Sequence, residues 1–287
     1  MTTTIETAAP VTVRPGVGRV LRLGAVRARY EIRSYFRASD AVFFTFLFPT
    51  MIFVLFAAVF STTGKVGGDG HGHGGITLAA YYLPGLVASG ILLSGVQNLG
   101  IDIAGERSDG TLKRLGGSPL PMISYFLGKV GVVLVTALAQ LVLLLGVAHF
   151  VFGVTLPSTA DVWARFAWIF ILSVLMSVVL GVGISGLPRS GRSASAVIVP
   201  ILLVLQFISG VYFSFADLPD WLKTVAGVFP LKWVAQGMRS VFLPDSFAAA
   251  EQTGGWDLGT TALMIAGWAV VGLVIALLTF RWVRKDR

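Results

Sequence analysis

The residues that could do chemistry are concentrated in one charged segment between two long apolar runs. Asp102, Glu106 and Asp109 offer three carboxylates close together in the sequence, and carboxylate oxygens are the ligands that hard divalent cations prefer. Near a lipid headgroup plane, such a metal site would fit a membrane-embedded enzyme that modifies lipids. This hypothesis predicts that metal-dependent turnover is lost when all three carboxylates are replaced.

The same segment, residues 100–119, also has the pattern of a charged connector. Its first half predicts a short charged helix that breaks at Gly110, and Pro119 predicts a turn back into an apolar run. Leu112 and Leu115 would then offer an apolar side to the cleft of a partner protein, while the neighbouring charges fix the register. The alternative is a solvated connector that touches no partner.

Uncharged polar residues are the other candidates, because the apolar runs contain no Asp or Glu. Proton-coupled and ion-coupled transporters usually depend on buried ionisable groups, so the sequence disfavours that class. The uncharged polar residues can either bond helices together or line a weakly polar translocation path. The candidates for such a path are Ser94, Gln97, Asn98, Gln140 and Gln206.

The chain lacks the motif with which most ATPases hold phosphate. No Gly-x-x-x-x-Gly-Lys-Ser/Thr loop occurs, so ATP and Mg²⁺ would have to be bound by a separate polypeptide. The chain also has no cysteine, which excludes disulfides and thiolate metal sites. We expect no catalytic residue, cofactor or metal here. His71 and His73 could share a metal with Asp69, but the glycines around them give no rigid ligand geometry.

The elements that must position these residues are predicted to be membrane-spanning helices. Hydrophobic residues make up 55% of the 287 residues and charged residues only 13%, about half the charged fraction of a soluble domain. A helix needs about 20 apolar residues to cross a bilayer. Six runs meet this length and predict an all-α integral membrane protein: Ala41–Phe60, Leu78–Leu99, Ile123–Phe152, Phe166–Leu187, Ala194–Phe215 and Leu258–Phe280.

The positive charges predict which ends of these helices face the cytoplasm. Of the 22 Lys and Arg residues, 17 fall on the side that holds both termini, and basic residues are enriched on the cytoplasmic side of membrane proteins. Both termini are therefore predicted to be cytoplasmic. Topology also accounts for the net charge of +8, so nucleic-acid binding is disfavoured. Lys129 lies near the start of the third run, and we expect its ammonium to extend to the interface, with the apolar part starting at Val130.

Two further elements are predicted before the first span. Residues 1–14 are predicted to be a disordered tail, and residues 15–40 an amphipathic helix on the inner leaflet with its arginines near anionic lipid headgroups. A simple topology anchor is the alternative for this helix. Residues 41–287 would form the six-helix transmembrane domain.

The outer segment 216–245 predicts a re-entrant hairpin of two short helices. Pro219 and Trp221 begin the first helix, and Pro230 ends it and starts the second. In the second helix, apolar residues share one face, and Lys232 and Arg239 lie on another. The hairpin would act as an outer gate or lid, and two interfacial helices without a gating role are the alternative.

With these elements in place, the sequence resembles the type-2 permease family of ABC exporters. In that family an acidic-basic pair followed by Gly-Thr-Leu, a Leu and a Ser-Pro marks the coupling loop that contacts the ATPase. The matching residues are Glu106, Arg107, Gly110, Thr111, Leu112, Leu115, Ser118 and Pro119. The family often has further acids where this chain has Ser108 and Lys113. A second resemblance, to the family's fifth span and outer hairpin, covers Ser209 to Pro219 with Trp221, Pro230 and Arg239.

The resemblance implies a bacterial cell-membrane permease that pairs with an ABC ATPase subunit and with a second copy or a closely related permease. ATP-driven closure of the ATPase subunits would push the coupling loops and open an outward path. The implied substrate is an amphipathic drug, an antibiotic or a lipid-like molecule, because the compact loops look most like those of daunorubicin and multidrug exporters. Exporters of polysaccharides or lipid-linked glycans share the same plan and remain the alternative.

Overall fold

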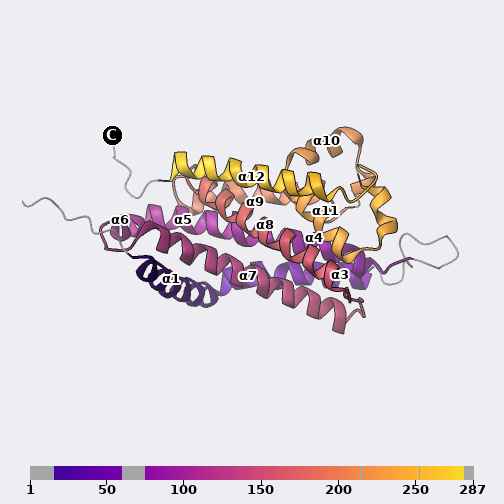
Figure 1. The fold of residues 1–287 in the computed structure, drawn as a ribbon, viewed down its shortest axis with the longest axis horizontal. Coiled ribbons are helices and arrows are strands. Elements are labelled where there is room, and N and C mark those ends of the chain that lie inside the picture. Colours follow the sequence, from indigo (N-terminus) through magenta and orange to yellow (C-terminus); the bar gives the residue numbers. More distant parts are fainter. Residues whose placement is uncertain (1–15, 60–74, 214, 252, 281–287) are drawn as a thin grey trace, which may run out of the picture.

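The computed structural model describes residues 16–59, 75–213, 215–251 and 253–280 (Figure 1). Over these ranges the regular structure is helical, and it contains no strand. The predicted tail, residues 1–14, and the residues Asp69, His71 and His73 lie outside the described ranges. The longer helices are α1 (Val17–Arg37), α3 (Phe48–Val59), α4 (Leu78–Leu92), α5 (Leu99–Ser108), α7 (Met122–Phe150), α8 (Ala160–Ser185), α9 (Gly191–Ile208), α10 (Asp220–Val228), α11 (Pro230–Phe242) and α12 (Leu258–Thr279).

Six helical segments are long and apolar enough to cross a membrane, which confirms the predicted all-α class with six spans. Short elements complete some of them: α2 (Ser39–Val42) and the π-helical η1 (Phe43–Leu47) precede α3 without a break. The spans are Ser39–Val59, Leu78–Ser108, Met122–Phe150, Ala160–Ser185, Gly191–Ile208 and Leu258–Thr279. Large apolar side chains on their outer faces are exposed, such as Leu263 and Leu277 of α12 at 71% and 75%.

The helix starts follow from local hydrogen bonding. Thr77 caps α4 by accepting from the Ala80 amide at 3.3 Å, and Ser190 forms a capping box with Ser193 at the start of α9. These side chains satisfy amides that have no partner within the helix.

The second span is longer than the sequence indicated, and this corrects two expectations. A π-helical segment, η3 (Leu93–Asn98), joins α4 directly to α5, so that one helix runs from Leu78 to Ser108. Asp102 and Glu106 therefore belong to the helix of the second span and not to a separate short helix in a loop. The expectation that the spanning helices contain no carboxylate was wrong for this reason.

The fifth span is shorter than the predicted run that ended at Phe215. Helix α9 ends at Ile208, and Gly210 follows with φ of 77°, a conformation that favours glycine. The chain then turns through η4 (Phe215–Asp217) toward α10. The apolar composition continued past this turn, so hydropathy alone did not reveal the end of the helix.

Helix α8 packs closely against both η3 and α12. A Cβ added at Gly95 would lie 2.0 Å from the Ser177 hydroxyl, and a Cβ added at Gly272 would lie 2.8 Å from the Leu180 amide nitrogen. Glycine at these positions allows the backbones to approach without a side chain between them. The helix that leads to Asp102 and Glu106 is thereby held against the centre of the bundle.

Helix α1 packs along α7 (Figure 1). Gly24 lies over Leu127, Gly131 lies over Ala28, and the Ser124 hydroxyl donates to the Val20 carbonyl at 2.9 Å. The apolar face predicted for residues 15–40 is thus used, at least in part, to contact a spanning helix. Arg29 and Arg33 lie away from this contact and are exposed.

The two helices predicted in segment 216–245 are α10 and α11, and α10 lies at the end of the bundle opposite to α6 (Thr111–Gly116) (Figure 1). The polar face expected for the second helix is not exposed. Every residue of α11 from Pro230 to Val241 is buried, because α11 lies against α4, α8 and α12. Lys232 and Arg239 are therefore inside the structure, and both must find partners there.

Candidate functional site

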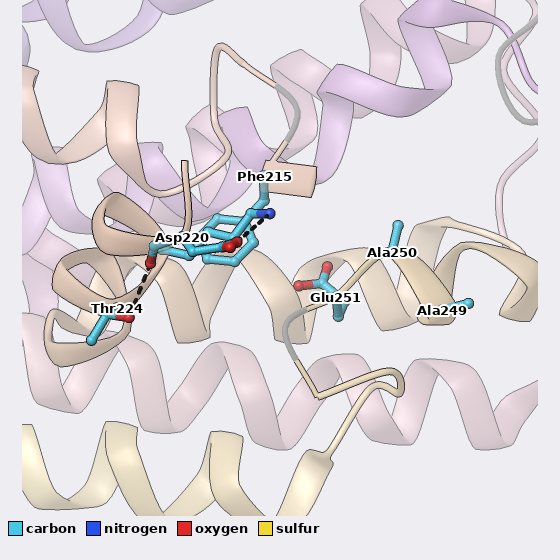
Figure 2. A pocket seen from close by; sticks show the side chains of 7 residues that line it. Phe215, Asp220, Thr224, Ala249, Ala250 and Glu251 are labelled. Carbon is cyan, nitrogen blue, oxygen red and sulfur yellow. Dashed lines mark hydrogen bonds and ion pairs between the residues drawn. The ribbon is translucent and has the colours of Figure 1, made fainter. Parts of the chain in front are cut away.

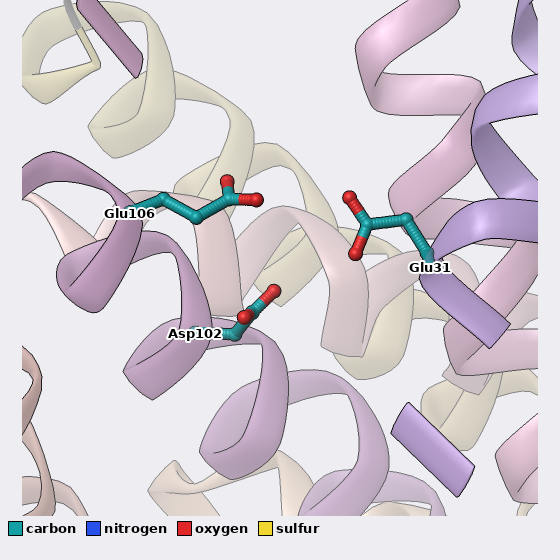
Figure 3. A group of neighbouring side chains, drawn as sticks. All are labelled: Glu31, Asp102 and Glu106. Atoms are coloured by element: carbon teal, nitrogen blue, oxygen red, sulfur yellow. The ribbon is translucent and has the colours of Figure 1, made fainter. Parts of the chain in front are cut away.

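The main constellation of charged residues joins α1, α5 and α7. The Lys129 ammonium lies 2.5 Å from an Asp102 carboxylate oxygen, 3.0 Å from Glu106 and 3.0 Å from Glu31. Figure 3 shows the three carboxylates converging from two helices, with Glu31 on α1 opposite the other two on α5. Lys129 is fully buried, so its ammonium does not extend to the interface as predicted.

Arg27 and Tyr125 complete what we call the inner charged cluster: Arg27, Glu31, Asp102, Glu106, Tyr125 and Lys129. The Arg27 guanidinium lies 2.5 Å from Glu31 and donates to Glu106 at 2.8 Å. The Tyr125 hydroxyl donates to the other Glu106 oxygen at 2.7 Å. Burial raises the pKa of Glu31, and the positive charges of Lys129 and Arg27 act in the opposite direction. Three carboxylates thus share two cations, with Glu31 and Glu106 largely buried and the Asp102 side chain 50% exposed.

The inner charged cluster bears on the hypothesis of a metal-dependent enzyme. Oxygens of Glu31, Asp102 and Glu106 lie within 4.8 Å of one another, which is close enough to share an ion. The Lys129 ammonium already contacts all three carboxylates and supplies their positive charge. Asp109 does not join these carboxylates. Its side chain accepts a hydrogen bond from the Thr111 amide at 2.8 Å, and this bond lowers the pKa of Asp109. The three acids that the sequence grouped together therefore do not converge, and the geometry favours an ion-pair cluster.

The segment that follows α5 is a tight turn and a short helix. Gly110 has φ of 78°, a left-handed conformation that glycine adopts without strain. Arg114 donates to the Thr111 hydroxyl at 3.0 Å, which stiffens the first turn of α6. Arg107 donates to the Pro188 carbonyl between α8 and α9, so the turn is tied to the neighbouring inner loop.

The side chains exposed on this segment differ from those that the sequence suggested. Leu112 is only 2% exposed and belongs to the core, so it is not available in this structure to enter a partner's cleft. Leu115 is half-buried, and Pro119 is exposed. The charged side chains of Lys113 and Arg114 form the accessible surface of α6.

The candidate path residues have different surroundings. Gln140 of α7 is 1% exposed and lies against Gly90 of α4, and neither atom of its amide has a hydrogen-bond partner in the part of the chain that the structure describes. The Ser94 hydroxyl is likewise unpaired within those ranges. Gln97 lies in η3 and is half-buried.

The other two candidate path residues are bonded elsewhere. Asn98 donates to the Thr45 hydroxyl of η1 at 2.8 Å and to the Tyr35 hydroxyl of α1 at 3.2 Å. Gln206 accepts from the Tyr212 hydroxyl at 2.6 Å, near the opposite end of α9. Asn98 and Gln206 therefore connect elements of the bundle.

At the other end of the bundle, the candidate gate residues have different environments. Trp221 is 68% exposed on α10, whereas Pro230 is buried at the start of α11 and Pro219 precedes α10. Arg239 is buried, and its guanidinium lies 2.5 and 3.1 Å from the two carboxylate oxygens of Glu251. Figure 2 shows Glu251 at the wall of a cavity of about 390 Å³ that Phe215, Asp220 and Thr224 also line.

Sequence reasoning missed Glu31, Arg27 and Glu251 as members of these groups. Glu31 is the one acid in α1, and Lys129 is a charge within an apolar run. A buried lysine needs a carboxylate partner, so those two observations together could have suggested the pair. No comparable signal marks Glu251, because its partnership with Arg239 depends on the path of the loop after α11.

The sequence is similar to that of known proteins. A family model described as "ABC-2 type transporter" matches residues 26–243, from within α1 to just past α11. Two curated proteins are similar, each a "Probable multidrug ABC transporter permease YbhR", from Escherichia coli strain K12 and from Escherichia coli O157:H7. Each is 22% identical over 166 residues, which cover 58% of this chain and 44% of the relative. The chain thus covers less than half the length of these relatives.

Proposed function

Because the chain belongs to the ABC-2 type transporter family, we propose that it is the membrane-spanning permease subunit of an ATP-driven exporter. A separate ABC ATPase subunit would bind ATP and Mg²⁺ and supply the energy. Both termini and the α5–α6 turn would lie on the cytoplasmic side of a bacterial cell membrane. A second copy of the chain, or a closely related permease, would complete the transporter.

The observation that carries this proposal is the continuous helix from Leu78 to Ser108. It leads from the outer half of the bundle to a turn with exposed Lys113 and Arg114. An ATPase that pushes on α6 would act directly on the end of this helix. The rigidity of a helix means that a displacement at one end is passed along its axis and not absorbed within a flexible loop.

The inner charged cluster determines which elements would move together. Lys129 and Arg27 bind Glu106 of α5 and Glu31 of α1 at the same time. A buried charge left without its partner costs roughly 3–5 kcal/mol, so α1, α5 and α7 would move as one body during a cycle and keep these charges paired. Glu106 would therefore act inside this body, and not through direct contact with the ATPase.

The proposed substrate is an amphipathic drug, an antibiotic or a lipid-like molecule. The relatives' printed name refers to multidrug transport, and the outer faces of several spans are apolar and exposed. An amphipathic cargo can be recognised through such diffuse apolar surfaces. Export of a polysaccharide or lipid-linked glycan is the alternative, and a competition assay with both substrate classes would separate them.

A two-glycine insertion between Asp109 and Gly110 tests the coupling. The variant complex, reconstituted in liposomes with the partner ATPase, should still bind the ATPase and hydrolyse ATP but should lose most of its export. The same insertion between Leu156 and Pro157, in the connection between α7 and α8 at the other end of these helices, serves as the control. Full export by the Asp109 variant would contradict the proposed coupling route.

A charge reversal tests the proposed ATPase contact. Lys113→Glu should weaken co-purification of the ATPase, because Lys113 is exposed on α6. Lys223→Glu, on α10 at the opposite end of the bundle, should leave co-purification unchanged. Equal co-purification in both variants would remove α6 from the contact surface.

A further inference from the structure

Arg239 connects three elements at the outer end of the bundle. From α11, its guanidinium binds both oxygens of Glu251, which follows η5 (Asp245–Ala250), and also donates to the Gly210 carbonyl at 3.3 Å. Gly210 lies in the turn after α9, where an added Cβ would lie 3.0 Å from the guanidinium. Arg239 and Glu251 are 5% and 7% exposed, so the pair is shielded from competing water.

Other polar contacts lie within α11 or join it to different neighbours. Lys232 donates to Gln236, and Gln236 donates to the Trp256 carbonyl at 2.7 Å, just before α12. At the other edge of α11, Arg165 of α8 donates to the Ser240 carbonyl at 2.8 Å. Of these contacts, Arg239–Glu251 is the one that joins opposite charges.

The surroundings of Glu251 provide room for this pair to separate. The cavity of about 390 Å³ is lined by Glu251, by Phe215, and by Asp220, Lys223 and Thr224 of α10. In Figure 2 Glu251 lies apart from Phe215, Asp220 and Thr224. A carboxylate that leaves Arg239 can enter this space without displacing packed side chains. The separated charges would then be hydrated, which lowers the cost of opening relative to a closed apolar site.

We propose that the Arg239–Glu251 ion pair is the latch of an outer gate: at rest it holds the segment after η5 to α11, whose Arg239 also binds the turn after α9, and it separates when cargo leaves. This inference rests on the proposed function of an exporter and adds Glu251 as a positioning residue of the gate. Arg239 would stay on the buried helix α11, while the segment that carries Glu251 would move.

The absence of cysteine in the chain allows a direct test by single-cysteine labelling. Ser209→Cys places a thiol next to Gly210 at a position that is fully buried at rest. A membrane-impermeant methanethiosulfonate reagent, applied from the outer side of the purified full-length protein in liposomes, should label it slowly. Adding Glu251→Gln should accelerate labelling roughly tenfold or more, because breaking a buried ion pair shifts an equilibrium by at least that factor.

Two further variants keep this labelling test falsifiable. Asp161→Asn removes an exposed carboxylate in the first turn of α8 that does not line this cavity, and it should leave the labelling rate unchanged. The charge exchange Arg239→Glu with Glu251→Arg should restore slow labelling. Equal labelling rates in the parent and Glu251→Gln proteins would overturn the latch, and this arm of the experiment needs no ATPase.

The second arm asks whether the latch must open for export. In Arg239→Cys with Glu251→Cys, a bifunctional methanethiosulfonate reagent would join the two positions covalently. Export should stop after cross-linking and return after reduction, with ATPase binding intact. Undiminished export by the cross-linked complex would overturn the latch while leaving the exporter function in place. Absence of ATP-dependent export in the unmodified complex would instead contradict the proposed function.

Discussion

Gly181 of α8 faces the backbone carbonyl of Gly95 so closely that a Cβ added at residue 181 would lie 2.1 Å from that oxygen. Gly95 in turn lies close to α8, because a Cβ added at residue 95 would overlap the Ser177 hydroxyl. Two helices therefore meet backbone to backbone at the point where α4 changes into η3. This contact fixes the position of the helix that carries Asp102 and Glu106.

Gly181→Ala should destabilise the protein, because the obstructing atoms belong to the backbone and cannot rotate away. Overpacking of this kind costs about 1–3 kcal/mol. The melting temperature of the detergent-solubilised protein, followed by tryptophan fluorescence, measures the effect. Gly146→Ala is the matched control, since nothing lies within 4 Å of a Cβ there, and it should be neutral or slightly stabilising. A melting temperature for Gly181→Ala equal to that of the control would contradict the close contact.

Lys129→Met should destabilise the protein by roughly 3–5 kcal/mol, because it leaves the largely buried carboxylates of Glu31 and Glu106 with Arg27 as their one cation. Adding Glu106→Gln should recover part of the loss by removing one of the uncompensated charges. Thermal denaturation of the single and double variants provides the comparison. If the double variant is less stable than Lys129→Met, the two residues do not interact as the structure shows.

Lys232 gives the end of the bundle that holds α10 and α11 a dependence on pH. Burial lowers the pKa of Lys232 from 10.5 to about 8, so between these values the unfolded chain binds a proton that the folded chain does not. Stability rises with pH wherever the unfolded state binds more protons. The melting temperature should therefore increase from about pH 8 to pH 10 through this residue.

The variant that isolates this contribution is Lys232→Met. Its melting temperature should change less over the same pH range than that of the parent protein. Lys223→Met, in which a lysine of α10 is replaced, should keep the parent's pH dependence. The assignment to Lys232 fails if Lys232→Met and the parent show the same slope.

Gln140→Leu tests whether Gln140 only packs between helices or also lines the translocation path. The Gln140 amide is buried without a hydrogen-bond partner among the described residues, and such a group costs about 1–3 kcal/mol. The substitution should therefore raise the melting temperature while lowering export if Gln140 serves the cargo. Thr136→Val is the control, since the Thr136 hydroxyl bonds to its own helix at 2.9 Å. A lower melting temperature in Gln140→Leu would show that the amide is satisfied in the protein.

The six spans and the positions of α10 and α11 followed from the sequence because each depends on local signals. Length and hydropathy marked the spans, while Pro219 and Pro230 marked the helix starts. The extension of the second span to Ser108 could not be predicted in this way, since its charged residues look like a loop until their partners are known. Lys129, from a distant helix, is what allows that segment to remain helical and largely buried.

The sequence also could not predict the surroundings of α11. Periodicity placed Lys232 and Arg239 on a polar face, and a polar face is normally assigned to water. The structure buries that face against other elements of the chain, with Glu251 as the partner of Arg239. Long-range pairing of this kind depends on how the helices pack together, which hydrophobic periodicity does not describe.

The wide turn of η3 has a consequence for helical phase. A π-helical turn contains one residue more than an α-helical turn. Deletion of Val96 would therefore convert this turn into an α-helical turn, and the side chains after it would keep their original sides of the helix. The same deletion at Ile101, inside α5, would rotate Asp102 and Glu106 relative to α4 by about 100°. Deletion of one residue is thus tolerated in η3 but disrupts the structure in α5, although both belong to the same continuous helix.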